Sequence, residues 1–114
     1  MKYAALIYGD ESREATMTEE DNQREMDAYW AFQEKAGARA ESGEALHPTK
    51  SARTVRVRNG KVLTSDGPFA ETKEQLGGFY ILECETMEEA VELAAQIPSA
   101  LNGCVEVRPC VNFG

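Results

Sequence analysis

The chain has 114 residues, of which 20 are acidic and 12 basic, and its net charge at pH 7 is −8. This length fits a single domain, residues 1–114, which buries roughly two-thirds of its unfolded surface on folding. An acidic chain is unsuited to nucleic acid or anionic membrane partners, because phosphate binding needs basic side chains. The apolar run near the N-terminus is too short for a secretory signal or a bilayer span, which predicts a cytoplasmic location.

The cysteines and the histidine argue against disulfides and metal. Cys84, Cys104 and Cys110 lack a C-x-x-C spacing and lie in or beside apolar segments, so buried free thiols are predicted. A zinc site needs clustered His and Cys ligands, whereas the chain has one histidine. We therefore expect neither a metal nor a cofactor.

The first predicted strand, Lys2–Tyr8, is apolar on both faces, which indicates that both are covered. After an acidic loop, Thr18 with Asp21 three residues later predicts a helix start. This helix is expected to run to about Ser42 and to end at Gly43. Its apolar side chains recur at helical spacing and are interpreted as core packing: Met26, Tyr29, Trp30, Ala36 and Ala40.

A hairpin is predicted around Asn59-Gly60, because a type I′ turn needs positive φ at both central residues. Its strands are Thr54–Arg58 and Lys61–Thr64, and a short strand at Ala45–His47 is expected to be interrupted by Pro48. Alternation predicts one packed and one solvated side: Val55 and Val57 inward, Arg56 and Arg58 outward. The basic patch of these arginines with Lys61 is either an anion-binding surface or an ordinary solvated strand face.

The last third of the chain predicts a strand, a helix and a strand. Phe79–Cys84 follows a Gly-Gly pair and is apolar on both faces, as expected at the centre of a sheet. Thr86 and Glu89 form a capping box that opens a helix from Met87 to about Ile97. The final strand is expected at Cys104–Cys110, with its two valines on one face.

This order of elements predicts two split β-α-β units. They form an α+β, ferredoxin-like antiparallel sheet with two helices on one face plus a β-hairpin. The second apolar face of Lys2–Tyr8 and Phe79–Cys84 would be a large exposed patch on a monomer. The simplest cover is a second copy of the chain, sheet against sheet, so a homodimer through the open sheet face is expected.

The polar connection after the hairpin is the predicted site. Asp66 cannot close the usual Asx-turn, because Pro68, two residues later, has no N–H. Gly67 permits close approach of a ligand and is expected to be extended before the proline. The carboxylate is then available as a general base or polar anchor, or it caps the turn through the Phe69 N–H or pairs with Lys73.

Three segments resemble the DGPF branch of the YCII-related family over nearly the whole chain: D-G-P-F-A-E-T-K-E-Q-L-G-G-F-Y-I-L-E at 66–83, T-V-R-V-R-N-G-K-V at 54–62 and V-E-V-R-P at 105–109. The resemblance implies a dimeric α+β barrel built from two ferredoxin-like subunits, with a histidine and an aspartate near the cleft. Asp66 matches the aspartate with its motif intact. The first helix has no histidine, so His47 is the one candidate partner, although a lone loop histidine is more often a surface or packing residue.

These features predict a small-molecule-binding protein. In the first hypothesis it is a cofactor-independent enzyme that performs proton abstraction, isomerisation or elimination on a small organic acid. Asp66 is the base or orienting group, and a neighbouring carboxylate would raise the pKa of His47. The predicted substrate-binding residues are Arg56, Gly67, Pro68, Phe69, Lys73 and Arg108.

The alternative is a non-catalytic metabolite-binding or regulatory module. The exposed loop Glu71–Glu74 would then be a recognition surface, since polar loops often carry function. The resemblance implies an extracytoplasmic-function sigma factor as a partner, because such factors are frequent genomic companions of DGPF proteins.

Overall fold

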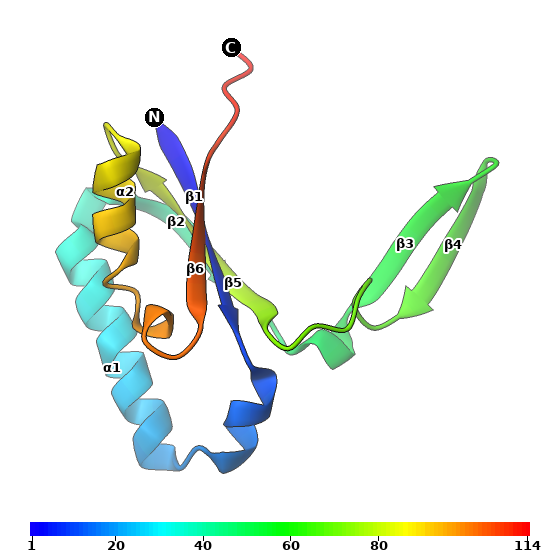
Figure 1. The fold of residues 1–114 in the computed structure, drawn as a ribbon, viewed down its shortest axis with the longest axis horizontal. Helices are drawn as coiled ribbons and strands as arrows, with labels where there is room; N and C mark the ends of the chain where they lie inside the picture. Colours follow the sequence, from blue (N-terminus) through cyan, green and yellow to red (C-terminus); the bar gives the residue numbers. More distant parts are fainter.

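The computed structural model describes residues 1–114 and has two parts, a body and a projecting hairpin (Figure 1). The body is a four-stranded sheet in the order β2-β5-β1-β6, antiparallel at every pairing, with two helices on one face. This confirms the predicted ferredoxin-like α+β fold with β1 and β5 at its centre. The bounds are β1 Lys2–Gly9, α1 Glu19–Ala36, β2 Ala40–Ala45, β5 Gln75–Glu83, α2 Met87–Ala94 and β6 Cys104–Pro109.

Helix α1 ends earlier than the sequence predicts. Gly37 adopts a φ of 56° and its N–H donates to the Gln33 carbonyl, which stops the helix. The residues expected to continue it form β2 instead, an edge strand in which Ser42 lies opposite Ile81 of β5. The prediction that the helix reaches about Ser42 is therefore wrong, because pairing with β5 outweighs local helix propensity. Of the short strand expected at Ala45–His47, only Ala45 lies in a strand, as the last residue of β2, and Leu46 and His47 belong to the loop that follows.

The start of α1 carries the predicted cap. The Thr18 N–H donates to Asp21 Oδ2 at 3.0 Å and the Asp21 N–H donates to Thr18 Oγ1 at 3.1 Å. The first of these bonds holds the pKa of Asp21 below its ordinary value. The stability that this pKa shift provides is present above the unfolded pKa, about 3.9, and is lost as pH falls through the folded pKa.

We expect Thr18→Ala to lower the free energy of unfolding by about 1 kcal/mol, because the Asp21 N–H loses the Thr18 hydroxyl as its acceptor at the helix start. Thr18→Ser keeps the hydroxyl and should restore the wild-type value. Urea unfolding monitored by circular dichroism gives both numbers. Equal midpoints for the alanine and serine variants would contradict a stabilising role for the cap.

The bounds of α2 and β5 also differ slightly from those predicted from the sequence. The second helix stops at Ala94 rather than about Ile97, and β5 begins at Gln75, before the Gly-Gly pair. Thr86 accepts from the Glu89 N–H as predicted, but the Glu89 carboxylate accepts from the Glu85 N–H at 3.3 Å. Neither helix of the structure has the length and apolar composition needed to cross a membrane.

The core lies between the sheet and the helices. Phe32 of α1 packs against Tyr80 of β5 with ring centroids 5.0 Å apart. The buried apolar residues are Tyr3, Ala5, Ile7, Phe32, Ala36, Leu82, Cys84, Ala90, Leu93, Ala94 and Ile97. On the opposite face of the sheet, β1 and β5 present half-buried apolar side chains with no helix over them: Ala4, Leu6, Tyr8, Phe79 and Ile81.

The predicted hairpin is confirmed, as β3 Arg53–Arg58 and β4 Lys61–Asp66, with φ of 52° at Asn59 and 74° at Gly60. We call residues 53–66 the arm. It extends away from the body as a separate two-stranded sheet (Figure 1). The prediction that Val55 and Val57 are packed is wrong for a single chain, because both are exposed and no part of the body covers their face of the arm.

Candidate functional site

An apolar cleft of about 340 Å³ lies between α1 and the β2–β5 side of the sheet. Trp30 on α1 leaves 64% of its surface exposed above this cleft. Glycines allow β2 and β5 to approach closely beneath it, since a Cβ on Gly43 would lie 2.6 Å from the Phe79 carbonyl oxygen. The large apolar or aromatic side chains of the lining are those of Ile7, Met26, Tyr29, Trp30 and Tyr80. Phe79 also borders the cleft, but its side chain belongs to the open face of the sheet.

A second, polar cleft of about 300 Å³ continues from the first. The two share Ile7, Tyr29, Ala45 and Gly77, so they form one depression with an apolar and a polar end. Its polar end is lined by the short helix after β1, by α1, by the loop after β2 and by β5. The charged and hydrogen-bonding side chains there include Asp10, Glu11, Arg13, Glu14, Glu25, His47 and Gln75.

A hydrogen-bond network fixes the walls of the polar end. The Glu11 carboxylate accepts from the Thr49 N–H at 2.8 Å and from the Thr49 hydroxyl at 2.6 Å. The Glu11 N–H donates to Gln75 Oε1 at 3.0 Å. These bonds join the segment after β1 to the His47–Thr49 loop and to β5. The His47 backbone is thereby held beside the cleft before any ligand arrives.

Two further side-chain pairs line the polar end, and one of them includes Tyr29 at the junction of the clefts. The Tyr29 phenol oxygen is 2.6 Å from Ser99 Oγ, and burial raises the pKa of Tyr29, so it remains a neutral hydrogen-bonding group near neutral pH. Arg13 Nη2 lies 3.6 Å from Glu25 Oε2. Arg13 is the only arginine or lysine that lines the polar end, against four acidic side chains. The charge balance there is negative.

Asp66 lies elsewhere, at the base of the arm. Its side chain is 92% exposed, and its one ion pair is with Arg53 across the hairpin, with Arg53 Nε 3.6 Å from Asp66 Oδ1. No hydrogen bond joins its carboxylate to the Phe69 N–H, and no ion pair joins it to Lys73. The Asx-turn is absent, as the missing N–H of Pro68 predicts, and the partner of the Asp66 carboxylate comes from the facing strand of the hairpin.

The turn after Asp66 differs from expectation. Gly67 has a φ of 93°, a left-handed value that favours glycine, instead of the extended conformation predicted from Pro68. Its N–H donates to the Ala52 carbonyl at 2.8 Å and its carbonyl accepts from Thr54 Oγ1 at 2.9 Å. The glycine therefore closes the base of the arm, and these two bonds require the unusual backbone.

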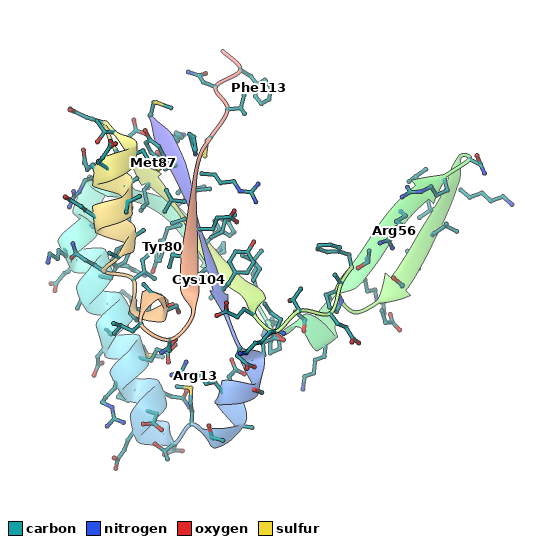
Figure 2. All side chains as sticks on the ribbon, in the orientation of Figure 1. Arg13, Arg56, Tyr80, Met87, Cys104 and Phe113 are labelled. Atoms are coloured by element: carbon teal, nitrogen blue, oxygen red, sulfur yellow. The ribbon has the colours of Figure 1, made fainter.

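Within one chain, the predicted site residues do not lie together. His47 lines the polar cleft, whereas Asp66 lines neither cleft, and no hydrogen bond or ion pair joins the two. Arg56 lies on the arm (Figure 2), and Arg108 lies on β6, where it pairs with Glu106 at 3.2 Å. The exposed Phe69 follows the arm. Roles for these residues stay predictions.

Sequence reasoning missed the aromatic wall of the cleft. The stripe on α1 was interpreted as core packing, yet Met26 and Trp30 are exposed and the buried residues of α1 are Phe32 and Ala36. A usable signal was present, because Trp30 and Phe32 cannot share one face of a helix. One of these aromatic side chains had to face away from the core.

The cysteines differ from the prediction as well. Cys84 is buried, as expected, but Cys104 is exposed and Cys110 is half-buried. Burial raises the pKa of the Cys84 thiol, and desolvation with the neighbouring Glu74 raises that of Cys104, so the two thiols differ in accessibility to a reagent. We expect iodoacetamide to leave Cys84 unmodified in the folded protein while it labels the exposed Cys104. Peptide mass spectrometry before and after denaturation measures this, and rapid native labelling of Cys84 would contradict the core described above.

The antiparallel sheet, the two covering helices and the amphipathic cleft define a small α+β protein of the ferredoxin-like type. Residues 1–114 match the model of the YCII-related domain, and the chain belongs to that family. An uncharacterised protein of Rhizobium meliloti (strain 1021) is 41% identical over 113 residues, which cover 96% of this chain and 91% of the relative. The resemblance to the YCII-related family is thus confirmed.

Proposed function

We propose that the protein binds a small organic molecule in the depression between α1 and the β2–β5 side of the sheet. The observation that carries this proposal is the continuity of an apolar wall with a hydrogen-bonding end. Ligand pockets typically combine an apolar lining with a few fixed polar groups. Trp30, Met26 and Tyr80 would contact an apolar or aromatic part of the ligand, and His47, Tyr29 and Gln75 would bind its polar part.

The charges of the polar end favour a neutral or cationic head group. Arg13 is already paired with Glu25, and Asp10, Glu11 and Glu14 lie in the same lining. A carboxylate ligand would have to compete with Glu25 for Arg13. The organic acid predicted from the sequence is therefore the less favoured ligand class for this cleft.

For a catalytic role we propose proton abstraction, isomerisation or elimination without a cofactor. His47 is the acid–base candidate within the cleft, since histidine is the side chain most often used for general acid–base catalysis. Asp66 would reach a bound substrate only from another copy of the chain, because it lines neither cleft of its own. We propose a homodimer through the open sheet face, where Leu6 and Phe79 lack a cover.

A thermal-shift screen tests the proposal, with neutral, cationic and carboxylate-bearing aromatic compounds as probes. A ligand at a hundredfold excess over its dissociation constant stabilises the protein by about 2.7 kcal/mol. Hits should be lost in Trp30→Ala and kept in Val91→Ala, which removes an exposed side chain of α2 outside the clefts. Hits unaffected by Trp30→Ala would contradict binding in this cleft.

The same hits allow the catalytic residues to be tested. We expect His47→Gln and Asp66→Asn each to lower turnover of an active compound by about a hundredfold or more, the usual contribution of a general acid or base. Binding should persist in both variants. Turnover that survives both changes would rule out acid–base roles, and a complete absence of ligands would favour the regulatory module and a pull-down with a sigma factor.

A further inference from the structure

The arm has an apolar face that nothing in the chain covers. Val57 lies opposite Val62, and Val55 lies on the same face. These valines leave 61% (Val55), 57% (Val57) and 68% (Val62) of their surfaces exposed. The other face carries Arg56, Arg58, Lys61 and Leu63, as strand alternation requires. An isolated two-stranded hairpin is marginally stable in water. The arm therefore needs a surface to pack against.

The amount of exposed surface points to a partner of the size of the chain itself. The accessible area is 8362 Å², whereas a compact monomer of this size exposes about 6,200 Å². The radius of gyration is 16.1 Å, against about 13 Å for a compact domain of this length. The excess area is roughly 2,200 Å², and obligate dimers bury about 1,000–2,500 Å² on each partner.

Charge complementarity identifies the partner as a second copy. The arm contains four basic residues and one acidic residue, whereas the remaining chain contains eight basic and 19 acidic residues. Helix α1 alone has six acidic and two basic residues. The net charges of the arm and of the body of an identical chain are opposite, which favours their association. The contact itself is apolar, because Arg56, Arg58 and Lys61 lie on the face opposite the valines. A two-fold axis would use both arms in the same way, because one surface patch meets its complement reciprocally.

We propose that the valine face of each arm packs against the body of a second copy of this chain, so that two arms clasp one dimer. This contact is separate from the pairing of open sheet faces and does not depend on ligand binding. Asp66 closes the base of the same arm, so the clasp brings this exposed carboxylate to the partner. In the dimer, Asp66 of one chain would then lie against the body of the other chain, which it does not reach within its own chain.

The test compares the two faces of the arm. Val57→Glu with Val62→Glu places charges on the valine face, and Leu63→Glu places one on the opposite face of the same strand. Sedimentation velocity over a range of concentrations gives the dissociation constant of each dimer. We expect the double variant to weaken the dimer by at least about a hundredfold, and the Leu63 variant by less than about threefold. A monomeric wild type, or equal constants for the wild type and the double variant, would overturn the proposal.

A second variant keeps the test decisive if the charged one fails to fold. The Gly67 N–H and the Ala52 carbonyl are already 2.8 Å apart, so Asn-Gly can replace residues 53–66 and leave the body intact. Dimer affinity that is unchanged by this replacement would refute the clasp. Hydrogen exchange separates the clasp from the sheet-face pairing: the arm amides of the wild-type dimer should be protected and should lose protection on dilution. Arm amides that exchange freely in an intact dimer would also refute it.

Discussion

Replacing Gly77 with leucine is expected to abolish ligand binding while the fold remains intact. Gly77 lines both the apolar and the polar cleft, at the point where they meet. A Cβ built at this position meets no other atom within 4 Å, and the backbone is outside the left-handed region. A side chain can therefore be added without moving the sheet, and because the Gly77 backbone lines both clefts we expect the leucine to crowd the junction between them.

The neighbouring glycine provides the control. A Cβ on Gly78 would lie 2.8 Å from the Glu44 carbonyl oxygen, so Gly78→Ala should strain the β2–β5 pairing by about 1–3 kcal/mol. Gly77→Leu, in contrast, should keep the wild-type urea midpoint. Titration calorimetry with a compound from the thermal-shift screen is expected to show an affinity loss of at least about a hundredfold. Normal affinity in Gly77→Leu would place the ligand elsewhere.

The topology was predictable because its signals are local. Apolar residues on both faces of β1 and β5, the cap at Thr18 and the Asn59-Gly60 turn each depend on residues close in sequence. Strand β2 was missed for the opposite reason. Its sequence, A-E-S-G-E-A, is polar, short and without strand propensity, and it is a strand only because β5 offers a free edge. Nothing within those six residues encodes that edge.

Asp66 shows how far local reasoning about a site can go. The missing N–H of Pro68 correctly excludes an Asx-turn, but the partner of the carboxylate is Arg53, 13 positions earlier, brought there by the hairpin register. The alternation in β3 likewise shows that Val55 and Val57 share one face of the hairpin, but it does not show which surface packs against that face. The ligand cleft was beyond such reasoning, since its walls come from Trp30, Gly43 and Gly77, on three different elements.

The small size of the core makes one substitution especially severe. Leu82 is 0% exposed on β5, between Tyr3 of β1 and Ala40 of β2. Removing its side chain leaves a cavity, so Leu82→Ala should cost about 2–5 kcal/mol of unfolding free energy. The net stability of a domain is about 5–15 kcal/mol. A loss of this size is therefore a large fraction of what keeps the chain folded.

The matched control is Leu101→Ala, which removes the same atoms from a side chain that is 90% exposed and therefore leaves no cavity. Its effect on the free energy of unfolding should stay within about 0.5 kcal/mol. Urea midpoints must be compared at one protein concentration, since stability that includes association rises with concentration. That dependence is itself informative. If the body and arm of one chain rely on a second copy, the Leu82→Ala variant should regain part of its lost stability as the concentration increases. A midpoint independent of concentration would mean that this small core alone keeps the chain folded.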